Sequence, residues 1–204
     1  KKRLDEDEAL RAKVNEALVP MGLRYEGTCE ITHYLWALVQ DYGLDNLKKR
    51  VKRPLSNLSV ANFYGCHILM PPDVMGFENP RNPRSMEMLA EALGARNVDF
   101  EQRLACCGFH AIYPAECEAL ASNGVSCLTA RAAGADCLVT PCPLCHMAID
   151  MWQADSQKRF DADITMPVLH LPQLVGLALG FTPKEMAIDR HVVKAAPMLE
   201  RKLT

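Results

Sequence analysis

The sequence lacks an excess of charge of either sign, a long apolar run and an apolar leader. It has 23 Lys and Arg against 25 Asp and Glu, so it has no basic excess of the kind that proteins use to bind nucleic acid. The longest apolar candidate, residues 169–181, contains Pro172 and Gln173 and is too short to span a bilayer. The first eight residues are mostly charged and are unlike a signal peptide. These absences predict a cytoplasmic protein without a transmembrane segment and without a nucleic-acid partner.

Short apolar segments alternate with longer helical ones along most of the chain. The pattern predicts strands over residues 59–64, 97–100, 137–140 and 166–169, and helices over residues 85–93, 114–132, 145–153 and 171–179. Ser85 is placed to cap the first of these helices. Such alternation is typical of an α/β domain with a mainly parallel sheet and helices on both faces. We expect this domain to occupy residues 56–204, after a helical segment at residues 1–55 that includes a short β-like run at residues 28–32.

Cysteine is abundant, with nine in 204 residues. In a reducing compartment such a number favours metal binding or catalysis over disulfides. Five of the nine follow predicted strands: Cys66, Cys106, Cys107, Cys142 and Cys145. Because ligands bind beyond the carboxyl ends of parallel strands, we expect these thiols to converge at one edge of the sheet.

The remaining cysteines are interpreted as buried core residues, since free cysteine is among the most buried residue types. They are Cys29, Cys117, Cys127 and Cys137. The histidines close to the five-cysteine set, His67, His110 and His146, are interpreted as polar neighbours of the site.

Five thiolates exceed the four ligands of a tetrahedral zinc site, and the excess favours an iron–sulfur cluster. The adjacent side chains of Cys106 and Cys107 diverge, which suits two metal atoms better than one. Gly108 allows the backbone to turn there. Zinc stays open as the second reading. A redox pair of Cys142 and Cys145 is the third, and it leaves the other cysteines unexplained.

The motifs Cys66, Cys106-Cys107-Gly108 and Cys142-Pro143-Leu144-Cys145 together resemble the cysteine-rich CCG domain of the heterodisulfide reductase B-subunit family. The stretches at residues 63–66, 76–83, 140–145 and 169–174 resemble that family as well. The likeness extends over residues 58–180. Residues 8–54 more loosely resemble the segment that joins the two CCG copies of the family, so the chain is interpreted as containing the second copy only.

The resemblance implies that the five cysteines bind a non-cubane [4Fe-4S] cluster. It further implies an oxidoreductase subunit that is active within a complex, beside flavin-bearing and ferredoxin-like iron–sulfur subunits. Such a subunit passes electrons to a disulfide, sulfur or quinone acceptor, and its complex can dock at the inner face of a membrane. The alternative is a zinc- or cluster-stabilised assembly subunit of a succinate dehydrogenase-type complex. In either case, we expect the apolar loops at residues 70–72 and 109–113 to meet a partner.

Overall fold

The computed structural model describes residues 1–203, and the chain forms two compact units, the second of which begins at Tyr34. Leu35 and Leu47 belong to the hydrophobic core of this larger unit. The helices that carry them therefore pack with the sheet domain. The predicted division at residue 55 stays a prediction.

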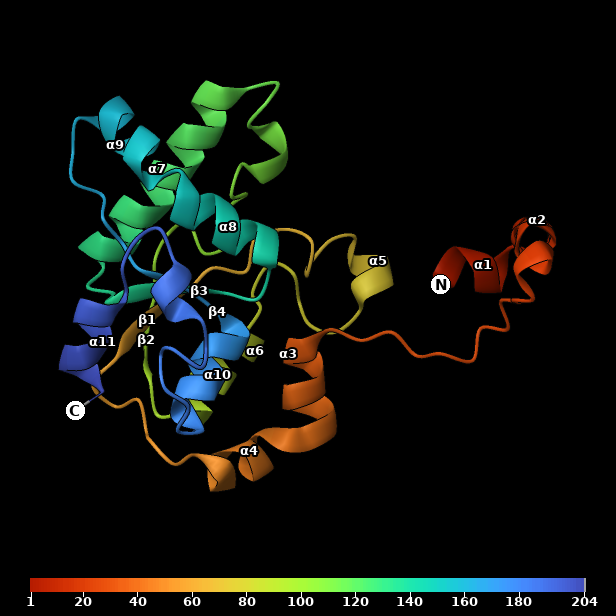
Figure 1. The fold of residues 1–204 in the computed structure, drawn as a ribbon, viewed down its shortest axis with the longest axis horizontal. Helices are drawn as coiled ribbons and strands as arrows, with labels where there is room; N and C mark the ends of the chain where they lie inside the picture. Colours follow the sequence, from red (N-terminus) through yellow and green to blue (C-terminus); the bar gives the residue numbers. More distant parts are fainter. Residues whose placement is uncertain (204) are drawn as a thin grey trace. The chain divides into compact units, whose positions relative to one another are not determined.

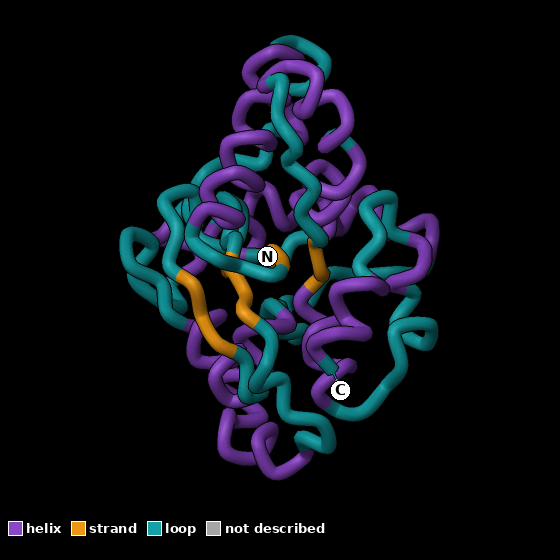
Figure 2. The backbone as a smooth tube through the Cα atoms, turned by 90° about the vertical axis from the view of Figure 1, so that its left-hand side faces the viewer, coloured by secondary structure: helices purple, strands orange, loops and turns teal. Residues whose placement is uncertain are grey.

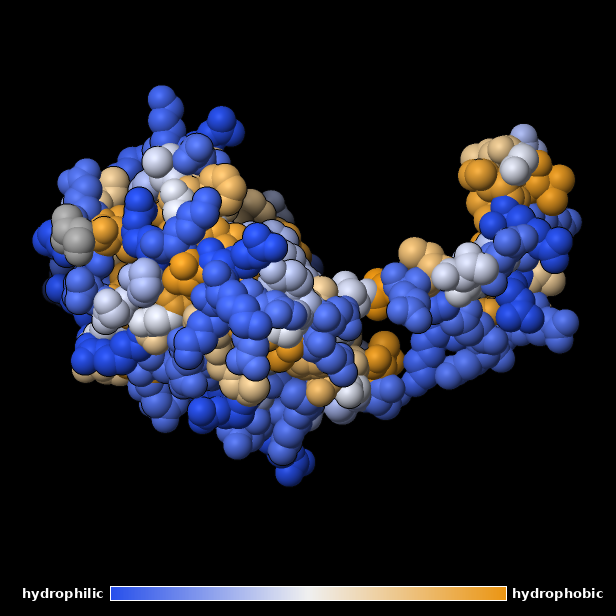
Figure 3. Space-filling view, turned by 90° about the horizontal axis from the view of Figure 1, so that it is seen from below, coloured by the Kyte–Doolittle hydropathy of each residue, from blue (hydrophilic) through white to orange (hydrophobic). Residues whose placement is uncertain are grey.

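The N-terminal unit, residues 1–33, is helical and has no core of its own. Its elements are α1 (Lys2–Glu6), α2 (Glu8–Leu18) and a 3₁₀ turn (Val19–Met21). The Asp7 carboxylate caps α2 by accepting from the Leu10 N–H at 2.9 Å. None of residues 1–33 is buried, and Figure 3 shows apolar side chains on the unit's surface. Residues 28–32 form no strand, so that prediction is wrong; no second strand is present there to pair with them.

The larger unit is built on a four-stranded sheet. The strands are β1 (Ser59–Asn62), β2 (Arg96–Val98), β3 (Cys137–Thr140) and β4 (Val168–His170). They lie in the order β2-β1-β3-β4 and every neighbouring pair is parallel. Figure 2 shows the strands inside the unit, with helices around them. The predicted α/β class with a parallel sheet is confirmed.

Helices and turns connect the strands. The helices are α3 (Tyr34–Trp36), α4 (Leu44–Arg50), α5 (Pro72–Met75), α6 (Ser85–Ala92), α7 (Glu116–Ala132), α8 (Pro143–Met151), α9 (Gln153–Phe160), α10 (Leu171–Ala178) and α11 (Ala196–Lys202). A π-helical stretch (Ala37–Gly43) joins α3 to α4, and 3₁₀ turns span Phe109–Ala111 and Ile188–Arg190.

Alternating side chains of the buried strands supply two separate cores. Val60 and Val139 face a core that includes residues of α6 and α10. Ala61 and Leu138 face a second core that includes residues of α7 and α8. Figure 1 shows the same arrangement, with α7, α8 and α9 on one side of the strands and α6 and α10 on the other. Helices therefore cover both faces of the sheet, as predicted, because strands buried on both faces need apolar partners on each.

Helix α6 is capped by a side chain from the loop before it. The Glu78 carboxylate accepts from the backbone N–H groups of Arg84 at 2.6 Å and Ser85 at 3.0 Å, and the Ser85 hydroxyl donates to it as well. Ser85 is itself the first helical residue, so its prediction as the N-cap is wrong. The longer Glu78 side chain satisfies the free donors of the first turn in its place. This contact ties the loop that follows Cys66 to α6.

Candidate metal centre

The five predicted thiols line one pocket. Cys66 lies in the loop after β1, Cys106 and Cys107 lie in the loop after β2, and Cys142 and Cys145 lie at the start of α8, after β3. The rest of the pocket is formed by His67, Phe109, His110 and Leu144. Strands β2, β1 and β3 are neighbours in the sheet, so their carboxyl-end loops emerge side by side. The convergence expected from the sequence is therefore present.

The thiols differ in their exposure around the pocket. Cys107 and Cys145 are buried, Cys66 and Cys142 are half-buried, and Cys106 is exposed. Within residues 1–203, no three side chains of His, Cys, Asp or Glu are grouped closely enough to hold a single metal ion. The five thiols around the pocket thus range from buried to exposed. A donor set of thiols alone suits zinc or an iron–sulfur cluster among the common metal groups.

Cys145 is the hydrogen-bonding centre of the set. Hydrogen bonds with its thiol lower the pKa of Cys107 and that of Cys142. The pKa of Cys145 itself is raised, first by its bond to Cys107 and then by its bond to Cys142. Backbone N–H groups of Cys145 and Leu144 at the start of α8 also lower the pKa of Cys142. Thiolate is the form that binds metal, so the start of α8 favours metal binding.

The opposite effect acts on Cys66. Burial raises the pKa of the Cys66 thiol, and the charges of Cys106 and Cys107 raise it further. Several thiolates so close together repel one another, and bound metal cations would relieve that repulsion.

Two glycines allow close packing at the cysteine loops. Gly65 has φ +69°, and a Cβ there would lie 2.8 Å from Sγ of Cys145. Gly108 has φ +78°, and a Cβ there would lie 2.8 Å from the Cα of Ala119. The Gly108 N–H also donates to Sγ of Cys106 at 3.4 Å. The backbone turn expected at Gly108 is present, whereas the role of Gly65 was not predicted.

His170, whose role was not predicted either, holds the loop before Cys142. Its Nε2 lies 3.3 Å from the Pro141 carbonyl oxygen. The His170 side chain also accepts from the backbone N–H of Gln173, and the Gln173 side chain accepts from the His170 N–H at 2.9 Å. Because a carbonyl oxygen can only accept, a hydrogen bond at this contact is donated by a protonated Nε2. The spacing from His170 to Gln173 is that of a capping box, a sequence signal that could have revealed the cap of α10 but not the contact with Pro141.

The three neighbouring histidines are not equivalent. His67 and His110 line the pocket, and their rings stack at 5.4 Å between centroids. His146 lies outside the pocket lining and meets the His191 ring edge-on, with 4.6 Å between centroids. Only the first two therefore face the space that the thiols surround.

None of the four remaining cysteines lines the pocket. Cys127 and Cys137 are buried, as expected, and burial raises the pKa of the Cys127 thiol to about 12. Cys29 and Cys117 are exposed, so their interpretation as core residues is wrong. Cys29 lies in the unit without buried residues, and Cys117 lies in the first turn of α7, away from the core.

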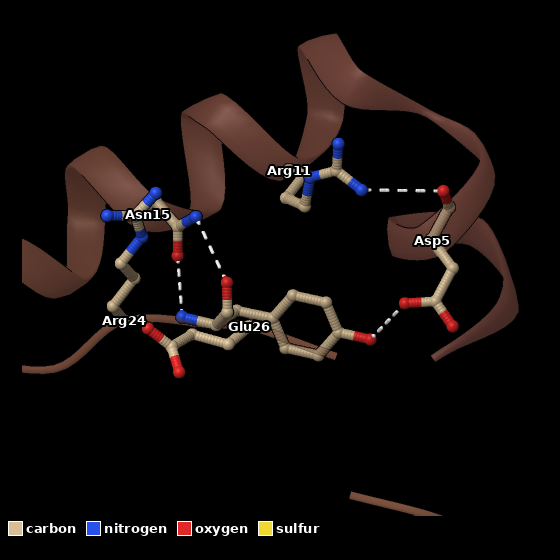
Figure 4. Close-up of a pocket in the computed structure, with 6 residues that line it drawn as sticks. Asp5, Arg11, Asn15, Arg24 and Glu26 are labelled. Carbon is tan, nitrogen blue, oxygen red and sulfur yellow. Dashed lines mark hydrogen bonds between the residues drawn. The ribbon is translucent and has the colours of Figure 1, made fainter. Parts of the chain in front are cut away.

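The N-terminal unit has a pocket of its own, shown in Figure 4. The Asn15 side chain bonds the backbone N and O of Tyr25 at 2.6 and 3.3 Å, and the Tyr25 hydroxyl donates to Asp5 at 2.7 Å. Arg11 donates to the backbone oxygen of Asp5 at 3.4 Å. The polar side chains that line this pocket therefore have a structural role, because their hydrogen bonds tie residues 24–26 to α1 and α2.

Residues 60–150 match the family described as a cysteine-rich domain, CCG. The chain is 47% identical over 192 residues to the 8-methylmenaquinol:fumarate reductase membrane anchor subunit of Wolinella succinogenes, covering 94% of this chain and 67% of that one. It is 34% identical over 202 residues to the B-subunit of the ferredoxin/F(420)H(2)-dependent CoB-CoM heterodisulfide reductase of Methanosarcina acetivorans, covering 97% and 66%. The chain belongs to the heterodisulfide reductase B-subunit family. As a family member it is an oxidoreductase subunit of the iron–sulfur kind, and it spans about two thirds of the length of these relatives.

A solved structure supports the fold of this heterodisulfide reductase B-like chain. A hypothetical protein from Helicobacter pylori matches it with a TM-score of 0.72 at 18% identity, over 95% of this chain and 34% of that one. At that identity the likeness shows the fold alone. Among residues 1–203, no helix is both long and apolar enough to cross a bilayer.

Proposed function

We propose that this chain binds a non-cubane [4Fe-4S] cluster through Cys66, Cys106, Cys107, Cys142 and Cys145. The observation that carries the proposal is the meeting of all five thiols, from the carboxyl ends of three adjacent strands, in one pocket. The number of donors supports it, because one tetrahedral zinc ion uses only four. The lowered pKa values of Cys107 and Cys142 favour thiolate at the buried Cys107 and at the start of α8.

Within a heterodisulfide-reductase-like complex, the chain passes electrons between a partner's clusters or flavin and a disulfide, sulfur or quinone acceptor. The cluster, when bound, would supply the redox centre. The protein would shield it through Phe109 and Leu144 and expose it on the side of Cys106. Shielding by apolar groups is one of the factors that set the potential of such a centre.

A second candidate is an assembly subunit of a fumarate reductase- or succinate dehydrogenase-type complex, holding zinc or a cluster for structure. It is favoured by the 47% identity to a fumarate reductase membrane anchor subunit. The first candidate requires a redox-active centre, whereas the second does not.

Elemental analysis and spectroscopy of the protein purified without oxygen separate these candidates. A [4Fe-4S] site predicts about four iron atoms and about four sulfides per chain, a brown protein and a spectrum that changes on reduction. About one zinc per chain without sulfide would overturn the first proposal and support the second.

A further inference from the structure

A buried carboxylate behind the thiol pocket links two of the cysteine loops. Glu87 on α6 is 9% exposed and does not line the pocket. Its two oxygens have partners on different loops: Oε2 accepts from the Tyr64 hydroxyl at 2.6 Å, and Oε1 accepts from Nη2 of Arg103 at 2.7 Å. Tyr64 lies two residues before Cys66, and Arg103 lies three residues before Cys106.

The Tyr64 side of this link is fully buried. Tyr64 is 0% exposed, and its hydroxyl oxygen accepts from the Met86 N–H at 2.9 Å. The single hydroxyl hydrogen is directed to Glu87. A buried hydroxyl that both donates and accepts a hydrogen bond has one preferred orientation. Tyr64 therefore orients the backbone that leads through Gly65 to Cys66.

Arg103 completes the hydrogen-bond network on the other loop. Nη2 of Arg103 also donates to the Pro83 carbonyl at 2.6 Å, and its guanidinium lies 5.6 Å from the Tyr64 ring centroid. The backbone completes the loop, because the Tyr64 N–H donates to the Arg103 carbonyl at 2.9 Å. Strands β1 and β2 end at Asn62 and Val98, so beyond those residues this network replaces the hydrogen bonds of the sheet.

We infer that Glu87 is a positioning residue for the candidate cluster site, holding the Cys66 loop and the Cys106 loop at the separation that one bound group requires. The inference rests on the proposed function, which gives both loops that common group. A carboxylate suits the position because both neighbours are donors. In Glu87→Gln one of them would face an amide NH₂, and either Tyr64 or Arg103 would lose its acceptor.

Glu87→Gln and Asp136→Asn form a matched pair for the test. Asp136 accepts from the Ser59 N–H at 2.8 Å and pairs with Lys202 at 3.0 Å, at the opposite end of β1. Each chain is loaded with iron and sulfide without oxygen, and the unfolding of the apoprotein by urea is recorded. We then measure the electron paramagnetic resonance spectrum of the reduced protein and the rate of iron loss to a chelator.

We expect both variants to be less stable, but only Glu87→Gln to lose iron faster and to change the resonance spectrum. The expected acceleration is about tenfold, the lower end of the effect of groups that support metal ligands. A normal spectrum and a normal rate of iron loss in Glu87→Gln would leave Glu87 as a stability residue and overturn the inference. If Glu87→Gln does not fold, Tyr64→Phe removes the hydroxyl alone and is judged by the same two measurements.

Failure of the proposed function is distinguishable from failure of this inference. If the unaltered chain takes up no iron, the cluster assignment is wrong. The rates at which iodoacetamide alkylates Cys66 and Cys106 in the apoprotein then test the positioning directly. Faster alkylation in Glu87→Gln than in Asp136→Asn would support the inference, and equal rates would overturn it.

Discussion

Gly65 and Cys145 come so close that no side chain fits between them. A Cβ on Gly65 would stand 2.8 Å from Sγ of Cys145, and the positive φ of +69° is itself unfavourable for other residues. The contact joins the loop after β1 to the first turn of α8. Two residues that are 80 positions apart in the sequence thus share one steric constraint at the pocket.

The substitution Gly65→Ala should therefore impair cluster binding. The backbone strain costs about 1–2 kcal/mol, and the methyl group displaces the Cys145 thiol as well. Gly134→Ala is the control, because Gly134 has φ +85° and a Cβ added there would meet nothing within 4 Å. Both variants should be destabilised, measured by urea unfolding, but only Gly65→Ala should hold less iron per chain. Equal iron content in the two would contradict the steric argument.

The proposed ligands can be separated from the remaining cysteines. Cys107→Ser should lose or alter the cluster, because Cys107 is buried in the pocket and bonded to Cys145. Cys117→Ser and Cys127→Ser should keep it. Loss of about 1–3 kcal/mol in stability is expected for the buried Cys127, where a hydroxyl is left without a partner. The iron and sulfide content of the three variants tests this prediction. Equal loss of iron in all three would contradict the ligand assignment.

The buried His191 should make the fold sensitive to acid. Burial is the main cause of its lowered pKa, and Lys194 lowers it further, while Asp150, the Val168 carbonyl and Asp189 act in the opposite direction. Its Nε2 lies 2.9 Å from the Gln173 side-chain nitrogen, a contact that needs the ring unprotonated at that atom. In the unfolded chain the ring takes up a proton below about pH 6.5. The unfolded state then binds more protons than the folded state, so the free energy of unfolding falls as the pH drops through that value.

Chemical unfolding at about pH 7.5 and about pH 5.5 measures this dependence. His191→Gln should lose less stability between the two conditions than the unaltered chain. His110→Gln, which removes an exposed imidazole, should behave like the unaltered chain. A pH dependence that is identical in all three proteins would show that His191 makes no contribution.

The surface beside the pocket should be covered by a partner. Tyr113 is 96% exposed and Met70 is 51% exposed, whereas Phe109 and Ile112 are half-buried. An aromatic residue presented this fully is a typical anchor of an interface, and its loss costs about 2 kcal/mol or more in binding. Tyr113→Arg should therefore reduce the recovery of partner subunits in native mass spectrometry of the protein from its source. Tyr42→Arg is the control, because Tyr42 is an exposed aromatic on the π-helical stretch. A stable monomer that holds its cluster and reduces a small disulfide without partner subunits would contradict the prediction.

The fold was predictable where the residue pattern within one segment is enough to determine its secondary structure. The run at residues 137–140 is a strand in the structure as in the prediction, and the helix at residues 171–179 is one residue shorter than expected. The prediction failed where a group outside the segment determines its secondary structure or its helix cap. Residues 28–32 have strand-like composition but no pairing strand, and Ser85 lost its capping role to Glu78, which lies seven residues away.

Which thiols gather at one edge could be predicted from the chain's own pattern. Each of the three cysteine motifs follows a strand, and parallel strands all end at the same edge of their sheet. The contacts behind the thiols, by contrast, depend on tertiary packing. The Glu87 bonds to Tyr64 and Arg103, the His170 bond to Pro141 and the approach of Gly65 to Cys145 join residues between 16 and 80 positions apart. The periodicity and spacing within a single segment carry no information about such contacts, because each depends on how two separate segments pack.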